Sequence, residues 1–321
     1  MSALYHVVGV DMGATNTAFG IVDARGTILS QNNIHTGKYS TGEEYAKVLS
    51  NAIKLLITKN NLNNEIKGIG IGAPNGNMHT GAIENAVNIP WANGRTVPLA
   101  KIITEETGLS CKLTNDANAA ALGEMIYGVA KGMKDFIMIT LGTGVGSGIV
   151  SNGNLIIGHD GMAGELGHVT VIKHNGRPCG CGRSGCLETY TSAVGVAKTA
   201  REYLSLHPND TSLLREIIYR PITSKDVFEA AEEGDKLAIK VFAFTGRILG
   251  EAFCDFITFS SPQAIILFGG LSHASNYLLD PLQKAIDDNV MKVFRGKTQI
   301  LFSQLKGAEA AILGASALAW E

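Results

Sequence analysis

One pattern occurs twice in this 321-residue chain: a strand, a turn rich in glycine and threonine, and a second strand. In the first copy, residues 5–11 and 17–23 predict strands and residues 12–16 the turn between them. In the second copy, strands predicted at 135–141 and 148–151 flank a turn of the same composition. Because each turn leads back into a strand pattern and not into a helix, each copy predicts a β-hairpin. The copies lie about 130 residues apart, which indicates duplicated α/β halves and not a short solenoid repeat.

The segments around the hairpins show helical and strand patterns in turn. Apolar residues at helical spacing, including Tyr45, Leu49 and Ile53, predict a helix over 42–60. A domain boundary is predicted near residue 115. The other predicted elements are strands at 26–34, 68–72, 154–157 and 264–268, and helices at 98–107, 116–127, 192–204, 224–233, 235–259 and 307–320.

Charge and hydropathy exclude several classes of protein. The chain has 27 Lys and Arg against 29 Asp and Glu, a formal charge of −2, whereas a nucleic-acid-binding protein usually carries a basic stripe. No stretch of about 18 residues is apolar without glycine or polar breaks, so we expect no membrane span. The first residues lack the basic segment, apolar core and cleavage site of a signal peptide. We therefore expect a cytoplasmic protein that binds neither nucleic acid nor membrane.

Both glycine-threonine turns have the residue types that bind phosphate. Glycine allows backbone N–H groups to converge on an anion, and threonine hydroxyls add donors. Asp11, at the end of the first strand, offers carboxylate oxygens to Mg²⁺, directly or through water. The candidate phosphate-binding residues are Asp11, Gly13, Thr15, Asn16, Thr17, Gly142, Thr143 and Gly144.

Neither turn matches the common nucleotide-binding motifs. The Walker A spacing is absent, and the second turn is not a dinucleotide fingerprint because it leads into a strand. Taken singly, each turn is explained by an ordinary glycine-rich hairpin. The occurrence of both turns at matching places in two halves favours a site for nucleotide phosphates.

Three of the five cysteines, Cys179, Cys181 and Cys186, fall within eight residues. An odd number of cysteines clustered in this way fits a metal site in a reducing compartment better than a set of disulfides. Four Cys and His ligands form the closed tetrahedral site of structural zinc, which leaves no position for a substrate. The alternatives are simple buried cysteines and a redox pair, whose usual C-x-x-C spacing is absent. Spacing alone leaves the fourth ligand open among three histidines: His159, His168 and His174.

Several polar residues are candidates for acid–base chemistry or sugar binding. Asp116 precedes an alanine-rich helix, where it is either the N-cap or a general base in phosphoryl transfer, and Asn115 is the other candidate cap. Glu165 and His168 come just before the cysteine loop, and Glu188 follows it. Singly, these glutamates would be surface charges. Carboxylates at both edges of a rigid metal loop, however, suit a polyol, which needs fixed hydrogen-bond acceptors.

Six segments resemble, in the same order, the ROK family of bacterial sugar kinases and repressors, and within it the glucokinase branch. The cysteine segment is the most specific of them. The resemblance implies an actin-like, hexokinase-type (ribonuclease H-like) α/β fold with duplicated domains about a cleft. It implies a smaller domain of residues 1–115 and about 306–321, and a larger domain of 116–305 with the zinc loop 168–188. The six segments are 11–17 (DMGATNT), 115–120 (NDANAA), 141–148 (LGTGVGSG), 164–168 (GELGH), 179–188 (CGCGRSGCLE) and 268–270 (FGG).

The resemblance also implies a role for each candidate residue. ATP binds to both glycine turns and to Gly269 and Gly270, while Asp116 is the general base. His168 is the fourth zinc ligand and also faces the sugar. Family members are commonly dimers or tetramers, which implies a homodimer or homotetramer. The implied sugar-binding residues are Asn88, Asn115, Asp116, Glu165, His168 and Glu188.

The expected reaction transfers a phosphoryl group from ATP, with Mg²⁺, to a hexose, and glucose is favoured. The other acceptors left open are N-acetylglucosamine, N-acetylmannosamine, allose, mannose and fructose. The alternative from another class is a sugar-responsive repressor, whose N-terminal helix-turn-helix would have no room in the ten residues before the first turn. The chain departs from the family at 74–77 (PNGN), where many members have Pro-Gly-Pro.

Overall fold

The computed structural model describes residues 5–305 and 307–320 and forms two compact units, which we describe one at a time. The first unit contains the described residues up to Met133, together with Gly148–Gly164 and the chain from Ser303 onward. The second contains Lys134–Ser147 and Glu165–Phe302. The chain passes from one unit to the other four times, once within strand β10 (Val145–Ser151).

The first unit contains two β-sheets. Their strands are β1 (His6–Met12), β2 (Asn16–Val22), β3 (Ile28–His35), β4 (Ile66–Gly72), β5 (Gly76–Asn77), β6 (Ala82–Glu84), β7 (Thr96–Val97) and β8 (Cys111–Thr114). The larger sheet has the order β3-β2-β1-β4-β8, and the smaller has the order β5-β6-β7. β1 pairs antiparallel with β2, which confirms the first predicted hairpin, and parallel with β4. The helices of this unit are α1 (Gly42–Lys59), α2 (Leu99–Thr107), α3 (Asp116–Tyr127) and α9 (Gly307–Ala317).

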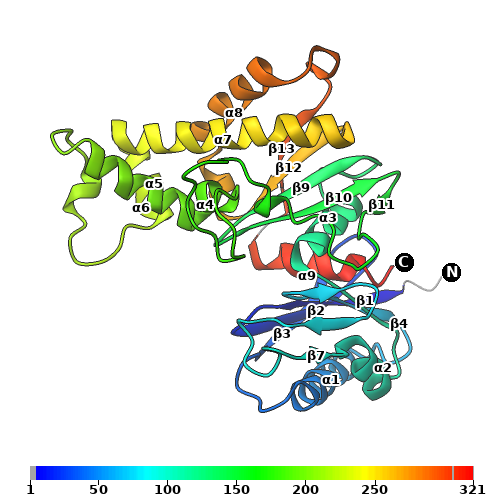
Figure 1. Ribbon diagram of the computed structural model, residues 1–321. Helices are drawn as coiled ribbons and strands as arrows, with labels where there is room; N and C mark the ends of the chain where they lie inside the picture. Colours follow the sequence, from blue (N-terminus) through cyan, green and yellow to red (C-terminus); the bar gives the residue numbers. More distant parts are fainter. Residues whose placement is uncertain (1–4, 306, 321) are drawn as a thin grey trace. The chain divides into compact units, whose positions relative to one another are not determined.

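The side chains of β1 alternate between two helical layers. Val8 and Val10 pack into the main core with α1 and α2, whereas Val7 packs against α9. A Cβ on Gly9 would lie 2.1 Å from the carbonyl oxygen of Ile312, so the lack of a side chain allows α9 to lie directly on the sheet. Figure 1 shows α1 and α2 covering one face of this sheet and α9 the other.

The ends of α1 and α2 follow from local sequence. The side chain of Thr41 accepts a hydrogen bond from the N–H of Glu44, which satisfies one free donor at the start of α1. Along α1 the stripe that includes Tyr45 is buried, as its spacing predicts. α2 ends at Gly108, whose φ of 73° is the left-handed conformation that glycine adopts most readily.

The second unit is built on parallel strands covered by helices. Its strands β9 (Phe136–Leu141), β12 (Ala264–Phe268) and β13 (Gln299–Phe302) pair in parallel. They belong to a sheet of order β11-β10-β9-β12-β13, in which β11 (Asn154–Leu155) and the part of β10 from Gly148 onward are counted with the first unit. The helices are α4 (Glu188–Thr191), α5 (Ala193–Leu206), α6 (Ser224–Glu232), α7 (Lys236–Ser260) and α8 (Ser275–Asn289). Short 3₁₀ helices are η1 (Leu166–His168), η2 (Leu213–Glu216), η3 (Gly270–Ala274) and η4 (Lys292–Phe294).

Helices α7 and α8 lie side by side because glycines of α7 allow a close approach (Figure 1). A Cβ on Gly246 would lie 2.6 Å from the carbonyl oxygen of Leu278. A Cβ on Gly250 would lie 2.4 Å from that of Leu282. Larger residues at these two positions would force the helices apart.

The division into units differs from the predicted boundary near residue 115. Helix α3 belongs to the first unit, because it packs closely on α9. A Cβ on Gly123 would lie only 2.7 Å from the Cα of Gly314, so the two helices touch through glycines. Residues 148–164 also join the first unit, where a Cβ on Gly148 would lie 2.7 Å from the Cβ of Ala121 on α3.

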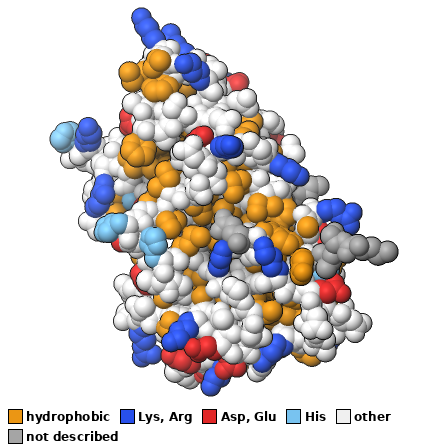
Figure 2. Space-filling view, turned by 90° about the vertical axis from the view of Figure 1, so that its right-hand side faces the viewer, with side chains coloured by type: hydrophobic (Ala, Val, Ile, Leu, Met, Phe, Trp, Pro, Cys, Tyr) orange, Lys and Arg blue, Asp and Glu red, His pale blue; other side chains and the backbone are white. Residues whose placement is uncertain are grey.

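The helices and one face of the surface bear on the predicted absence of a membrane span and of a nucleic-acid site. Among the residues that the structure describes, no helix is long and apolar enough to cross a membrane. Figure 2 shows one face of the molecule, on which Lys and Arg side chains stand singly or in small groups among hydrophobic and uncharged ones. That face carries no basic stripe of the kind that follows a nucleic-acid backbone.

Candidate active site

The first glycine-threonine turn joins β1 to β2 in the first unit. The N–H of Gly13 donates to the carbonyl oxygen of Asn16 at 2.9 Å, which closes the turn. The side chains of Thr15 and Asn16 are exposed. These two residues therefore present a hydroxyl and an amide that can donate to an anion.

Thr17 has a different role from the one predicted. Its side chain is fully buried, and its Oγ1 lies 2.9 Å from Oγ1 of Thr36 and 2.7 Å from the hydroxyl oxygen of Tyr45. Thr17 and Phe19 share one face of β2, and that face packs into the main core. The Thr17 hydroxyl holds the turn to the core, and the geometry does not support its predicted contact with phosphate.

Asp11 and Asp116 lie at the same edge of the larger sheet. Asp11 pairs with Gly72 of β4, and Gly72 pairs with Thr114 of β8, two residues before Asp116. The carboxyl ends of these parallel strands therefore bring both carboxylates together. Burial, and secondly the charge of Asp116, raise the pKa of Asp11 to about 6. Two neighbouring carboxylates of this kind can hold a divalent cation.

The structure identifies Asn115 as the residue that caps α3. Its side-chain oxygen accepts a hydrogen bond from the N–H of Asn118 at 2.7 Å. Asp116 is the first residue of the helix, and Oδ1 of its carboxylate accepts from the N–H of Ala117 at 2.9 Å. Asp116 is exposed, so its carboxylate is accessible to a substrate.

Asn88 lies on an exposed turn of the first unit. The turn is closed by the N–H of Ile89, which donates to the carbonyl oxygen of Ala86 at 3.0 Å. Ile89 and Ala86 are buried, whereas Asn88 is exposed. Its contact with a sugar stays a prediction.

The second glycine-threonine turn lies beside Gly269 in the second unit. The N–H of Gly142 donates to the carbonyl oxygen of Gly144 at 3.0 Å, and Thr143 at the tip is exposed. Gly269 has a φ of 104°, and a Cβ on it would lie 2.6 Å from the carbonyl oxygen of Leu141. Because β9 and β12 are parallel neighbours, the segments that follow them meet at one edge of the sheet. The two glycine segments predicted to bind ATP are therefore adjacent.

A pocket of about 350 Å³ adjoins Gly270 in the second unit. Helix α6 contributes Lys225 and Phe228 to its lining, and η3 contributes Leu271 and His273. Apolar side chains with a few polar neighbours are typical of a site for a small molecule. The sequence predicts α6 as a helix without giving it a role, because no spacing signal joins residues more than forty positions apart.

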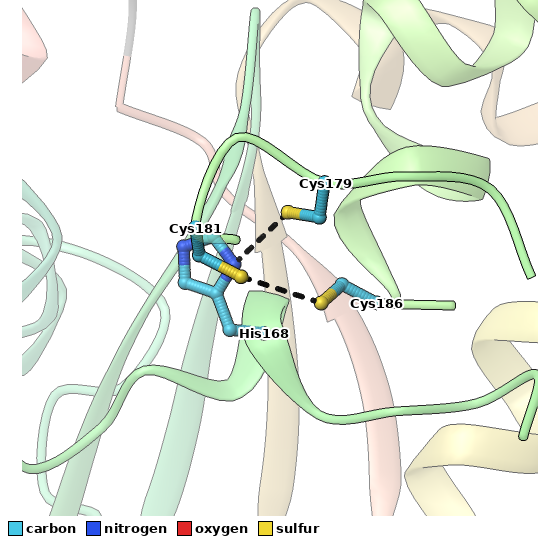
Figure 3. Close-up of side chains that lie close together, drawn as sticks. All are labelled: His168, Cys179, Cys181 and Cys186. Atoms are coloured by element: carbon cyan, nitrogen blue, oxygen red, sulfur yellow. Dashed lines mark hydrogen bonds between the residues drawn. The ribbon is translucent and has the colours of Figure 1, made fainter. Parts of the chain in front are cut away.

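Four potential metal ligands meet in the second unit: His168, Cys179, Cys181 and Cys186 (Figure 3). Their ligand atoms all lie within 4.8 Å of one another. The Sγ atoms of Cys181 and Cys186 are 3.7 Å apart, and Nδ1 of His168 is 3.5 Å from Sγ of Cys179. Zinc–sulfur bonds of about 2.3 Å in a tetrahedron place two sulfurs about 3.8 Å apart, so the residues fit zinc. Of the three histidines left open by spacing, His168 is the one in this cluster.

Val145, the first residue of β10, joins the second turn to the residues around the cysteine loop. Its N–H donates to Oε2 of Glu188 at 2.9 Å. Its carbonyl oxygen lies 2.0 Å from where a Cβ on Gly167 would be, so only glycine fits there. Glu165, two residues before Gly167, is exposed. Glu188, His168 and the second glycine-threonine turn therefore lie around the backbone of Val145.

Comparison with known proteins matches almost the whole chain to one family. The model of the ROK family matches residues 7–321, nearly the whole chain. The chain belongs to the ROK family.

Three ROK relatives are informative about this protein. The glucokinase of Halalkalibacterium halodurans is 41% identical over 279 residues, covering 86% of this chain and 84% of the relative. The glucokinase of Thermotoga maritima is 34% identical, covering 97% of this chain and 96% of the relative. The crystal structure of a ROK family glucokinase from Streptomyces griseus, in complex with glucose and AMPPNP, has a TM-score of 0.77 and 34% identity, covering 98% of each chain. These matches confirm the α/β fold of the actin-like, hexokinase type.

The predicted site residues of this ROK protein fall into two sets, one in each unit. The first unit holds Asp11, Gly13, Thr15, Asn16, Asn88, Asn115 and Asp116, together with the buried Thr17. The second unit holds Gly142, Thr143, Gly144, Glu165, His168, Glu188, Gly269 and Gly270, together with the three cysteines. Within each unit, the residues of neighbouring parallel strands meet at one sheet edge.

Proposed function

We propose that this ROK protein is an ATP-dependent hexose kinase and that glucose is its acceptor. Two findings support the proposal: the relative with 41% identity is a glucokinase, and the neighbour with 34% identity holds glucose and AMPPNP, an analogue of ATP. In this chain the proposal depends on Asp116, an exposed carboxylate at the start of a helix that Asn115 already caps.

Asp116 acts as the general base in the proposed reaction. The 6-hydroxyl oxygen of the sugar attacks the γ-phosphorus in line, its proton goes to the Asp116 carboxylate, and the bond to the ADP oxygen breaks. The products are ADP and hexose 6-phosphate. The phosphate charge is stabilised by hydrogen-bond donors of the two turns, including Thr15 and Thr143, and by the backbone at Gly269. The sugar hydroxyls bind to Asn88, Asn115, Glu165, His168 and Glu188.

We assign Asp11 to hold Mg²⁺, directly or through water. When bound, Mg²⁺ neutralises charge on the β- and γ-phosphates, which favours attack by an oxygen nucleophile. Carboxylate oxygens are the ligands that Mg²⁺ prefers. The raised pKa of Asp11 supports the assignment, because it marks a position where a carboxylate is unfavourable until a cation is near.

The ligand cluster of His168 and the three cysteines is proposed to bind zinc with a structural role. Four protein ligands close the coordination shell and leave no position for a substrate. Burial raises the pKa of the Cys186 thiol to about 12, so zinc binding would displace a proton from it. The metal would fix the conformation of the cysteine loop, and Glu188 follows directly after that loop.

The nucleoside of ATP is proposed to occupy the pocket beside Gly270. Phe228 and Leu271 provide apolar surface for a purine, and Lys225 and His273 provide polar contacts at its edge. The phosphates would then reach Gly269 and the second turn at the ends of β12 and β9.

The proposal is tested by measuring kcat/KM with ATP and Mg²⁺ for glucose, mannose, fructose, allose, N-acetylglucosamine and N-acetylmannosamine. Glucose is expected to give the highest value. A higher value for another of these sugars would change the acceptor and keep the kinase. No phosphorylation of any of them would refute the function.

A further inference from the structure

A short loop of the first unit, residues 157–163, rests on the side chain of Asn77. The loop is closed by the N–H of Ala163, which donates to the carbonyl oxygen of Ile157 at 3.1 Å. Nδ2 of Asn77 donates to the carbonyl oxygen of Asp160, in the middle of the loop, at 2.7 Å. A Cβ on Gly161 would lie 2.2 Å from Oδ1 of Asn77, so the backbone of the loop lies directly against this amide.

All four hydrogen-bonding positions of the Asn77 amide are used. Besides Asp160, its Nδ2 donates to Oε2 of Glu84 at 3.1 Å. Its Oδ1 accepts from the N–H groups of His79 at 2.9 Å and Thr80 at 3.4 Å. The residue is only 2% exposed, so each lost bond would leave a buried polar group without a partner. No other side chain type offers two donors and an acceptor at this size.

His79, two residues after Asn77, makes a second contact with the loop 157–163. Nε2 of His79 is 2.7 Å from the carbonyl oxygen of Gly158. Gly158 and Gly161 both have positive φ, 73° and 85°, so the loop conformation is defined by glycines and by these two contacts. The segment 74–77, at which this chain departs from the Pro-Gly-Pro of many family members, is thus the support of the loop.

We propose that Asn77 is a positioning residue for hexose binding, because it fixes the loop that leads into Glu165. Gly164 ends this stretch with a φ of 93°, and Glu165 follows at once in the chain. A fixed loop backbone sets the point from which the Glu165 and His168 segment begins. This inference rests on the proposed function, which assigns those two residues to the sugar.

Asn77 has both a role within its own hairpin and the proposed role toward the loop, and substitutions separate them. Asn77→Asp keeps the acceptor for His79 and Thr80 and loses both donors. Adding Glu84→Gln restores the hydrogen bond between positions 77 and 84, because the glutamine amide can donate to the new aspartate. The contact with Asp160 stays broken in that double variant. Thr80→Val is the matched control, since the Thr80 hydroxyl donates to Glu84 at 2.8 Å and accepts from the N–H of Ala82, both outside 157–163.

The experiment measures three quantities on the full-length protein: KM and kcat for glucose, KM for ATP, and hydrogen–deuterium exchange of the amides in 157–163. For Asn77→Ala and for Asn77→Asp with Glu84→Gln, we expect glucose KM to rise about tenfold, with kcat and ATP KM changed less than about threefold. Exchange in 157–163 is expected to become faster. In Thr80→Val, all of these quantities are expected to stay near wild type.

Each other outcome decides against the inference. Wild-type glucose KM in the double variant would show that the contact with Asp160 does not matter. Faster exchange in 157–163 without a change in glucose KM would make Asn77 a structural residue only. If wild-type protein neither bound nor phosphorylated a hexose, the proposed function would fail first, and the exchange data would still show whether Asn77 holds the loop.

Discussion

The carboxylate of Glu188 accepts a hydrogen bond from the backbone N–H of Val145 at 2.9 Å. Its other oxygen, Oε1, lies 3.9 Å from Sγ of Cys179. One side chain thus joins the turn proposed to bind phosphate to the loop proposed to bind zinc. Glu188 can therefore orient the turn and the loop together, and it is also a proposed sugar ligand.

Glu188→Ala is expected to lower the free energy of unfolding by about 1 to 3 kcal/mol, because the Val145 N–H loses a charged acceptor. Glu188→Gln keeps an acceptor oxygen and is expected to lower it by less than half as much. Urea denaturation of the two variants measures the difference. Equal stability of Glu188→Ala and wild type would contradict the linking role.

Gly144→Ala is expected to destabilise the second turn, since its Cβ would lie 2.5 Å from Oε2 of Glu188. To make room, the Glu188 carboxylate has to move away from the Val145 N–H, and losing that charge-assisted hydrogen bond costs about 1 to 3 kcal/mol. Gly142→Ala in the same turn is the control, because a Cβ there meets nothing within 4 Å. A larger loss of Tm for Gly142→Ala than for Gly144→Ala would refute this explanation.

Cys181→Ser is expected to lose zinc and thermal stability together, because it removes one of four ligands of a closed site. Metal content by atomic absorption and Tm by calorimetry are the measurements. Cys111→Ser, outside the cluster, should keep its zinc. Cys181→Ser protein with no bound zinc and full activity would exclude the structural role.

The pH dependence of stability tests the environment of Asp11. A pKa raised from 3.8 to about 6 means that the folded protein holds this proton more tightly than the unfolded chain. Without metal and nucleotide, Asp11 therefore lowers stability as pH rises from about 4 to about 6, by up to about 3 kcal/mol. Asp11→Asn should be more stable than wild type at pH 7 and equal to it near pH 4. Parallel stability curves over this range would show that Asp11 is an ordinary surface carboxylate.

The sequence predicts most elements of the first unit, because its signals there are local. The turn between β1 and β2, the apolar stripe of α1 and the glycine at the end of α2 each lie within a few residues. The core position of Thr17 follows from the same two-residue period, since it shares a strand face with Phe19. The predicted phosphate contact followed from residue type, which does not indicate which way a strand residue points.

The features that the sequence did not predict depend mostly on contacts between segments far apart in the chain. Helix α8 and strand β13 were not predicted, since Pro281 interrupts the helical pattern of α8 and β13 has only four residues. The boundary near 115 separated α3 from α9, because the close contact of Gly123 with Gly314 spans almost two hundred residues. The pocket beside Gly270 and the hydrogen bond between Asn77 and Asp160 also join segments far apart in the chain.

The cysteine loop was predicted from the sequence only in part. Its spacing predicts a zinc site, and the structure brings the three sulfurs together as expected. The choice of His168 over His159 and His174 needed the resemblance or the geometry, because all three histidines are close enough along the chain to reach the cysteine loop.

The role of Asp116 as general base is the central claim, and the kinetics of Asp116→Ala test it most directly. General-base catalysis contributes about 10² to 10⁴-fold, so we predict that kcat for glucose falls by a factor in this range. Glucose binding without nucleotide, measured by calorimetry, should weaken by less than about tenfold, because the other sugar ligands remain. Turnover of Asp116→Ala near the wild-type rate would contradict the account.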